Sequence, residues 1–161
     1  MKNLLNRVHE LHATVFRYVG YLSCPFLLFV RLYWGVQLIQ SGWGKLHNLQ
    51  NVTEFFTSLH LPAPAATAVF ISCLEFVGGI LLALGLFSRI ISLMMTVNLI
   101  VAYITADSEA LHAIFSDPDK FMAAAPFTFL MASLIILIFG PGFVSLDTLL
   151  GRLLGWHKPT S

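Results

Sequence analysis

Four apolar stretches, separated by polar or turn-forming residues, dominate the pattern along the chain. Helices rise about 1.5 Å per residue, so each stretch is long enough to cross most or all of an apolar bilayer core of about 30 Å. The pattern predicts four membrane-spanning helices, near residues 24–44, 65–86, 88–106 and 123–139. The second and third spans meet around residues 87–89, which predicts antiparallel neighbours joined by a tight turn.

Both ends of the chain carry amphipathic patterns. Near the N-terminus apolar residues recur at helical spacing, with charged residues elsewhere around the helix. After a Gly-Pro-Gly break, Ser145 can cap a second helix whose leucines share one face. We expect both segments to lie on the membrane surface, although they also suit binding of protein partners. The predicted division is an interfacial helix at 1–23, a four-helix transmembrane domain at 24–139 and an amphipathic tail at 140–161.

Composition supports a membrane protein. Hydrophobic residues make up 57% of the 161 residues and charged residues only 11%, which is more apolar than a water-exposed surface tolerates. After four spans no room is left for a separate soluble domain. The formal net charge is +1 and no basic cluster is present, which argues against nucleic acid as a partner. We therefore predict an all-α integral membrane four-helix bundle with amphipathic interfacial helices at both ends.

The placement of cations predicts the topology. With four spans both termini lie on one side of the membrane, and most cations fall on that side. By the positive-inside rule this side is the cytoplasm. Arg89 would anchor the turn between the second and third spans at the cytoplasmic surface. The cations on the predicted cytoplasmic side are Lys2, Arg7, Arg17, Arg89, Arg152 and Lys158, against Lys45 and Lys120 on the other.

Arg31 and Glu75 fall well inside the first two predicted spans, and Lys45 directly follows the first. A charge at membrane depth costs roughly 2.5 to 3.5 kcal/mol on insertion scales, so Arg31 should face protein, and Glu75 is its expected partner. One interpretation is a structural ion pair that fixes helix register. The other gives Glu75 a proton-handling or ligand-gripping role. Lys45 is expected to reach the outer interface, or to bind an anionic or quinone-like headgroup.

Glycines accompany these charges on the first two spans. Gly35 and Gly42 lie between the two cations of the first span, and Gly78, Gly79 and Gly85 follow the carboxylate of the second. Small residues let helix backbones approach closely in membranes. The glycines therefore predict close helix packing around the charged positions.

Cysteine and histidine give little support for metal or thiol chemistry. Cys24 and Cys73 lie at different predicted depths and form no C-x-x-C motif, so a thiol oxidase using its own pair is disfavoured. His47, His60 and His112 fall on the predicted outer face without the close spacing typical of a metal site, and we predict none. No histidine lies deep enough in a span to ligate a buried haem.

The segments RLYWGVQLIQSGWGKL, CLEFVGGILLALGLFSR and FGPGFVSLD resemble the DoxX family of small four-helix bacterial membrane proteins. The resemblance covers residues 25–147. The family's first motif has an Arg and a Lys bracketing glycines, and its second has a Glu followed by paired glycines and a basic residue. The matching positions are Arg31, Gly35, Gly42 and Lys45 in the first motif and Glu75, Gly78, Gly79, Gly85 and Arg89 in the second.

The resemblance implies a link to membrane redox chemistry, because relatives include a subunit of thiosulfate:quinone oxidoreductase and components of complexes connected with oxidative and thiol stress. It implies an accessory, non-catalytic subunit of a quinone-linked oxidoreductase in the bacterial cytoplasmic (inner) membrane. Such a subunit would bind a quinone or another small hydrophobic ligand near Arg31, Lys45 and Glu75. Protein partners and a homo-oligomer are expected, since a thin bundle can share its small-residue faces. A non-enzymatic scaffold or assembly factor is the main alternative, and a small transporter is a third.

Overall fold

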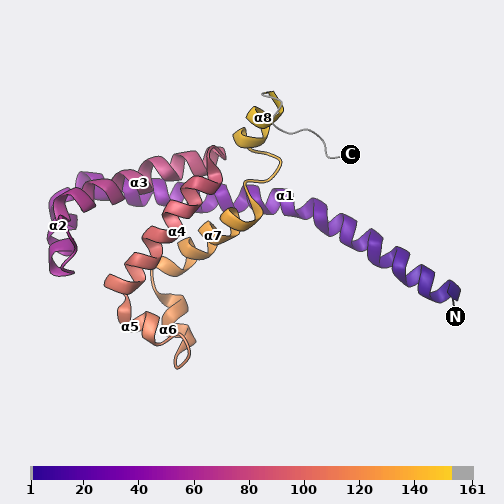
Figure 1. Ribbon diagram of the computed structural model, residues 1–161, viewed down its shortest axis with the longest axis horizontal. Helices are drawn as coiled ribbons and strands as arrows, with labels where there is room; N and C mark the ends of the chain where they lie inside the picture. Colours follow the sequence, from indigo (N-terminus) through magenta and orange to yellow (C-terminus); the bar gives the residue numbers. More distant parts are fainter. Residues whose placement is uncertain (1, 154–161) are drawn as a thin grey trace.

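The computed structural model describes residues 2–153, with side chains described from residue 22 onward. This part of the chain is entirely helical, which confirms the predicted fold class (Figure 1). Its elements are α1 (Lys2–His47), α2 (Leu49–Ser58), α3 (Pro64–Leu84), α4 (Ser88–Thr105), α5 (Ser108–His112), α6 (Pro118–Ala123), α7 (Pro126–Phe139) and α8 (Leu146–Leu153).

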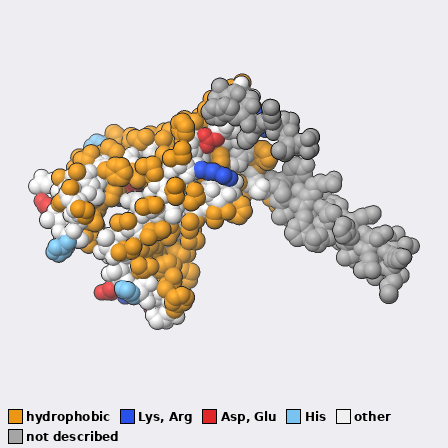
Figure 2. All heavy atoms as spheres, viewed as in Figure 1, with side chains coloured by type: hydrophobic (Ala, Val, Ile, Leu, Met, Phe, Trp, Pro, Cys, Tyr) orange, Lys and Arg blue, Asp and Glu red, His pale blue; other side chains and the backbone are white. Residues whose placement is uncertain are grey.

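Three helices are long and apolar enough to cross a membrane, namely the Leu22–His47 part of α1, and α3 and α4 in full. Helix α7 is also apolar but has only 14 residues, so it begins later than the predicted residue 123. The reason is local: Ala124 is extended, and Pro126, which lacks an N–H, begins a new helix. Large apolar side chains cover much of the outer surface (Figure 2), as lipid contact requires.

Helix α1 continues through the boundary predicted between residues 23 and 24. Pro25 lies inside the helix and removes one backbone hydrogen bond, yet the helix does not break there. The interfacial segment is thus continuous with the first span in its backbone, and the division into three regions stays a prediction. The side chains of Lys2, Arg7 and Arg17 and the whole of Lys158 lie outside the described residues.

The helices pack chiefly as two pairs. Helix α3 lies along α1, and α4 lies along α7 (Figure 1). The α3–α4 connection is the tight turn 85–87, which opens on Gly85 at φ +72°. The buried apolar core joins all four helices and includes Val30, Leu38, Leu74, Leu82, Met95, Leu99, Tyr103 and Ile136.

The connecting segments contain helices of their own. The amphipathic pattern did not single out α2 or α5, which follow the ends of α1 and α4 away from the α3–α4 turn (Figure 1). At the turn end, the predicted C-terminal helix is present as α8, and Ser145 caps it: the Ser145 Oγ accepts a hydrogen bond from the Thr148 N–H at 3.2 Å. The rest of the predicted tail, residues 154–161, lies outside the described residues.

Candidate functional site

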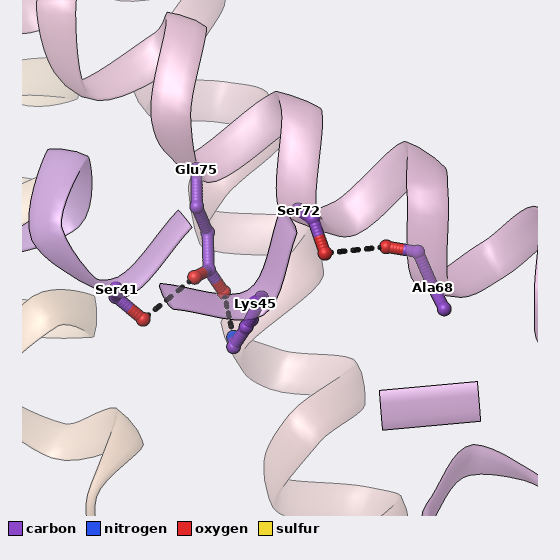
Figure 3. A network of polar contacts seen from close by, with 5 residues as sticks. All are labelled: Ser41, Lys45, Ala68, Ser72 and Glu75. Atoms are coloured by element: carbon purple, nitrogen blue, oxygen red, sulfur yellow. Dashed lines mark hydrogen bonds and ion pairs between the residues drawn. The ribbon is translucent and has the colours of Figure 1, made fainter. Parts of the chain in front are cut away.

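The carboxylate of Glu75 is the centre of a partly buried polar cluster between α1 and α3 (Figure 3). Glu75 is only 6% exposed. Its Oε1 lies 2.5 Å from the Lys45 Nζ, and its Oε2 accepts a hydrogen bond of 2.8 Å from the Ser41 hydroxyl. Two donors one helical turn apart on α1 therefore hold one carboxylate of α3, which satisfies a charge at membrane depth.

Close backbone contact sets the register that makes this cluster. Gly42 of α1 lies directly against the Phe76 backbone of α3, where any Cβ would overlap the Phe76 nitrogen. About two turns earlier on α1, a Cβ at Gly35 would lie 3.1 Å from the Gly79 carbonyl oxygen. Contact positions that lie earlier on α1 thus lie later on α3, as antiparallel packing requires. At this separation the Glu75 carboxylate reaches donors on α1 directly.

The other two predicted glycines have different neighbours. Gly78 faces α4, since a Cβ there would lie 2.9 Å from the Met95 methyl carbon. Gly85 ends α3, and its missing side chain leaves room for the Arg31 guanidinium. Only part of the glycine set therefore serves the α1–α3 contact.

A largely apolar pocket of about 520 Å³ opens beside the polar cluster. It is bounded by α1, α2, α3, α4 and the start of α7, so it lies at the end of the bundle away from the α3–α4 turn. Lys45, Glu75 and Asn98 bring polar groups to its wall. Most of the remaining lining is apolar, with Phe55 and Phe56 from α2, Leu99 from α4 and Phe129 from α7 among the larger side chains.

This wall can form hydrogen bonds with a polar group of a ligand, and its Lys45–Glu75 ion pair has no net charge. The Lys45 ammonium has three donors, of which Glu75 takes one, and the Asn98 amide both donates and accepts. Because Lys45 and Glu75 neutralise each other and the Asp107 carboxylate also lines the pocket, the pocket favours a neutral ligand with carbonyl or hydroxyl oxygens over an anion. The phenyl rings around it favour a flat apolar body.

Arg31 lies away from this cluster, contrary to the expectation that Glu75 would be its partner. Arg31 and Lys45 are 14 residues apart on α1, which is about 21 Å at the helical rise. Antiparallel register then puts Arg31 opposite Gly85 rather than Glu75. The Arg31 side chain is 1% exposed and its Nη2 donates a hydrogen bond to the Val144 carbonyl. Its Nε and Nη1 have no hydrogen-bond partner among the described residues.

Arg89 lies at the α3–α4 turn, near the loop that follows α7. A Cβ at Gly140 would lie 3.4 Å from the Arg89 Nη2, so the guanidinium rests beside that glycine. The neighbouring Asp147 accepts hydrogen bonds from the backbone N–H groups of Phe87 and Ser88, at 2.8 and 2.9 Å. Arg89 is therefore at the turn end of the bundle, away from Lys45 and Glu75.

Sequence reasoning did not single out Ser41 or Asp147. A signal for Ser41 was present, because Ser41 and Lys45 are four residues apart and share a helix face. For Asp147 the signal was weaker: it ends the third family-like segment and follows a helix-capping serine.

Thiols and imidazoles take no part in the cluster around Glu75. Cys24 and Cys73 are free, and the His47 Nδ1 lies 2.9 Å from the carbonyl oxygen of Trp43. Within residues 22–153 no three His, Cys, Asp or Glu side chains come together as metal ligands.

Comparisons with known proteins identify the family of the chain. The family model described as DoxX matches residues 26–108, which hold α2, α3 and α4 in full and most of the spanning part of α1. The chain is also similar to a Bacillus subtilis protein named "Putative oxidoreductase CatD". The two are 30% identical over 122 residues, covering 74% of this chain and 83% of the relative. No solved structure matches the chain. On the family match and this relative, the chain is a membrane protein of the DoxX family.

Proposed function

We propose that this DoxX protein is an accessory subunit of a membrane redox or stress-response complex, and that it binds a quinone or another small hydrophobic ligand in the apolar pocket. One observation carries the proposal: the cluster of the buried Glu75 with the partly exposed Lys45 and Ser41 lies on the wall of a pocket otherwise lined mostly by apolar side chains. Ligand sites are commonly apolar cavities with a few polar groups that fix orientation.

The size and polarity of the pocket suit a quinone ring. A volume of about 520 Å³ lies within the range of roughly 300 to 1,000 Å³ typical of small-molecule sites. A quinone carries two carbonyl oxygens, and Lys45 and Asn98 supply N–H donors on the wall. Phe55 and Phe56 would stack against or flank the ring. The word oxidoreductase in the Bacillus relative's name supports a redox setting.

In this proposal the chain's own residues position the ligand. Lys45 donates a hydrogen bond to one ligand oxygen, while the Glu75 carboxylate holds the ammonium in place and balances its charge. Electrons for reduction of the quinone come from a partner redox protein. Arg31 lies at the other end of the bundle and is not part of this binding site.

We further propose that the protein resides in the bacterial inner membrane with both termini in the cytoplasm. The placement of Arg89 and Arg152 at the α3–α4 turn end, and of Lys120 at the other, supports this orientation through the positive-inside rule. The acidic Glu109 and Asp117 then lie outside.

The decisive variant is Glu75→Gln, which keeps the shape but removes the charge that holds Lys45. Ubiquinone and menaquinone binding to purified protein should weaken by about ten-fold, or about 1.4 kcal/mol, because the Lys45 ammonium is no longer held where it donates to the ligand. Binding is measured by equilibrium titration in detergent. The matched control is Glu109→Gln, which makes the same chemical change at an exposed carboxylate and should leave binding intact.

Native purification in mild detergent tests the physiological ligand. Mass spectrometry of co-purified proteins and extracted small molecules should recover a quinone together with a redox enzyme. Recovery of protein partners without any ligand would favour the scaffold alternative.

In the titration experiment, equal quinone affinity of wild type and Glu75→Gln would show that the carboxylate is not part of the binding site.

A further inference from the structure

A second concave surface lies at the α3–α4 turn end, far from the ligand pocket. It is a groove of about 980 Å³ between α1, the α3–α4 turn, the loop after α7, and α8. Cys24 and Leu27 line it from α1, and Arg89 and Arg152 line it from α4 and α8. We call this the turn-end groove. None of its lining residues belongs to the pocket around Glu75.

The turn-end groove has an excess of positive charge. Arg89 and Arg152 both line it, and the buried Arg31 lies beneath Gly85 at the same end. The carboxylate among the lining residues is Asp147, and its two oxygens already accept hydrogen bonds from backbone N–H groups of the turn. Among the described residues, two guanidinium groups thus line the groove with one engaged carboxylate, and the third, Arg31, is buried beside it. Arginine forks bind phosphate oxygens in pairs, and a phosphate would offset this excess.

The edges of the groove are apolar and outward-facing. Phe87 is 58% exposed, Phe139 is 69% exposed and Phe143 is 73% exposed, and all three line the groove. Aromatic side chains at the ends of membrane spans commonly lie at the level of the lipid headgroups. A charged patch near the α3–α4 turn is flanked by hydrophobic atoms on the same face (Figure 2). The groove therefore combines arginine side chains that suit an anion with exposed phenyl rings that suit acyl chains.

We propose that the turn-end groove is a binding site for an anionic phospholipid of the adjoining leaflet. Its phosphate lies between Arg89 and Arg152, and its acyl chains run past Phe87 and Phe139. A lipid fits better than a free phosphate, because free phosphate would leave the exposed phenyl rings uncovered. Basic pockets between transmembrane helices near a membrane surface are a known setting for anionic headgroups.

The test titrates delipidated protein in detergent with dioleoyl phosphatidylglycerol or dioleoyl phosphatidylcholine and counts bound lipids by native mass spectrometry. Wild type should prefer phosphatidylglycerol. Arg89→Gln and Arg152→Gln should each lower that affinity by roughly five-fold, the effect of about one membrane-facing charge. Arg89→Lys keeps the charge but loses the fork, so its loss should be smaller.

Lys120→Gln is the matched control, since it removes one cation at the opposite end of the bundle and should not alter lipid preference. Arg152 lies on the exposed face of the short α8, so its variant decides the question if Arg89→Gln fails to fold. Equal affinity of wild type for the two lipids overturns the site, as does an unchanged preference in Arg152→Gln. Full displacement of the lipid by inorganic phosphate overturns the choice of a lipid over a free anion.

Discussion

Gly42 and Gly44 lie two residues apart on α1 but have opposite surroundings. A Cβ at Gly42 would overlap the Phe76 backbone of α3, whereas a Cβ at Gly44 would meet nothing within 4 Å. The neighbouring backbone at Gly42 cannot yield as a flexible side chain can. Because Gly42 is next to Ser41, the spacing it allows also sets the reach of the Glu75 cluster.

Gly42→Ala should therefore force α1 and α3 apart. We expect the free energy of unfolding in detergent to fall by about 1 to 3 kcal/mol, as overpacking usually causes. Gly44→Ala serves as the control and should leave stability unchanged or raise it by up to about 1 kcal/mol, because alanine favours helix. Denaturant titration followed by circular dichroism measures both. Equal effects of the two variants would contradict the close contact at Gly42.

At the residue scale the sequence predicted the charged positions in the helices better than it predicted which residues contact one another. Charges inside apolar helices are costly, so Arg31, Lys45 and Glu75 stand out without any structure. Which of these residues pair, however, depends on the axial register of the two helices, and the spacing of residues within one helix does not set that register. The glycine contacts decide the register, which is why Glu75 meets Lys45 and Arg31 meets the last turn of α3.

Among the elements, the α3–α4 turn depends on a residue far along the chain. Phe87 has φ +50°, a left-handed conformation that costs a non-glycine residue roughly 1 to 2 kcal/mol. The Asp147 carboxylate accepts hydrogen bonds from the Phe87 and Ser88 N–H groups, while the Asp147 N–H donates to the Gly85 carbonyl. The start of α8 thereby caps the start of α4 and supports a strained turn.

Asp147→Ala should loosen this junction. Loss of the cap should cost about 1 to 2 kcal/mol of stability and speed hydrogen exchange at the Phe87 and Ser88 amides. Asp147→Asn keeps one acceptor oxygen and should have a smaller effect. The measurement is hydrogen exchange with mass spectrometry of peptides covering the turn and, for comparison, the core of α3. Unchanged protection at the turn in Asp147→Ala would show that the cap does not support it.

Element boundaries followed the sequence where a strong local signal existed. The apolar runs predicted α3 and α4 to within one or two residues, because membrane helices need long uninterrupted stretches. The start of α7 was placed too early, since hydropathy continues through Ala123 while Pro126 sets the helix start. Helix α2 was missed because its short amphipathic pattern lies between two stronger apolar runs and is packed against α3.

For the whole molecule, the four packed helices differ in length. Helix α3 has 21 residues and is about 32 Å long, while α7 has 14 residues and is about 21 Å long. A bilayer core of about 30 Å matches the first and exceeds the second. The protein is therefore expected to thin the bilayer beside α7 or to lose stability where the bilayer is thick.

This mismatch predicts that the midpoint of thermal unfolding decreases as the acyl chains lengthen. Vesicles of dimyristoyl phosphatidylcholine should stabilise the protein more than vesicles of dierucoyl phosphatidylcholine, because mismatch costs fractions of a kcal/mol per Å. Calorimetry of the reconstituted protein measures the midpoints. A midpoint that rises with chain length would mean that the longer helices, rather than α7, set the preferred thickness.

The hydrogen bond from Arg31 to the Val144 carbonyl joins residues 113 positions apart. A ribosome adds Val144 113 residues after Arg31, so the first span enters the membrane before its arginine can meet this acceptor. Throughout synthesis another group, such as water or a lipid phosphate, has to solvate that guanidinium. Closure of the bundle at the turn end is thus a late step in biogenesis, and it cannot precede the emergence of the chain beyond α7.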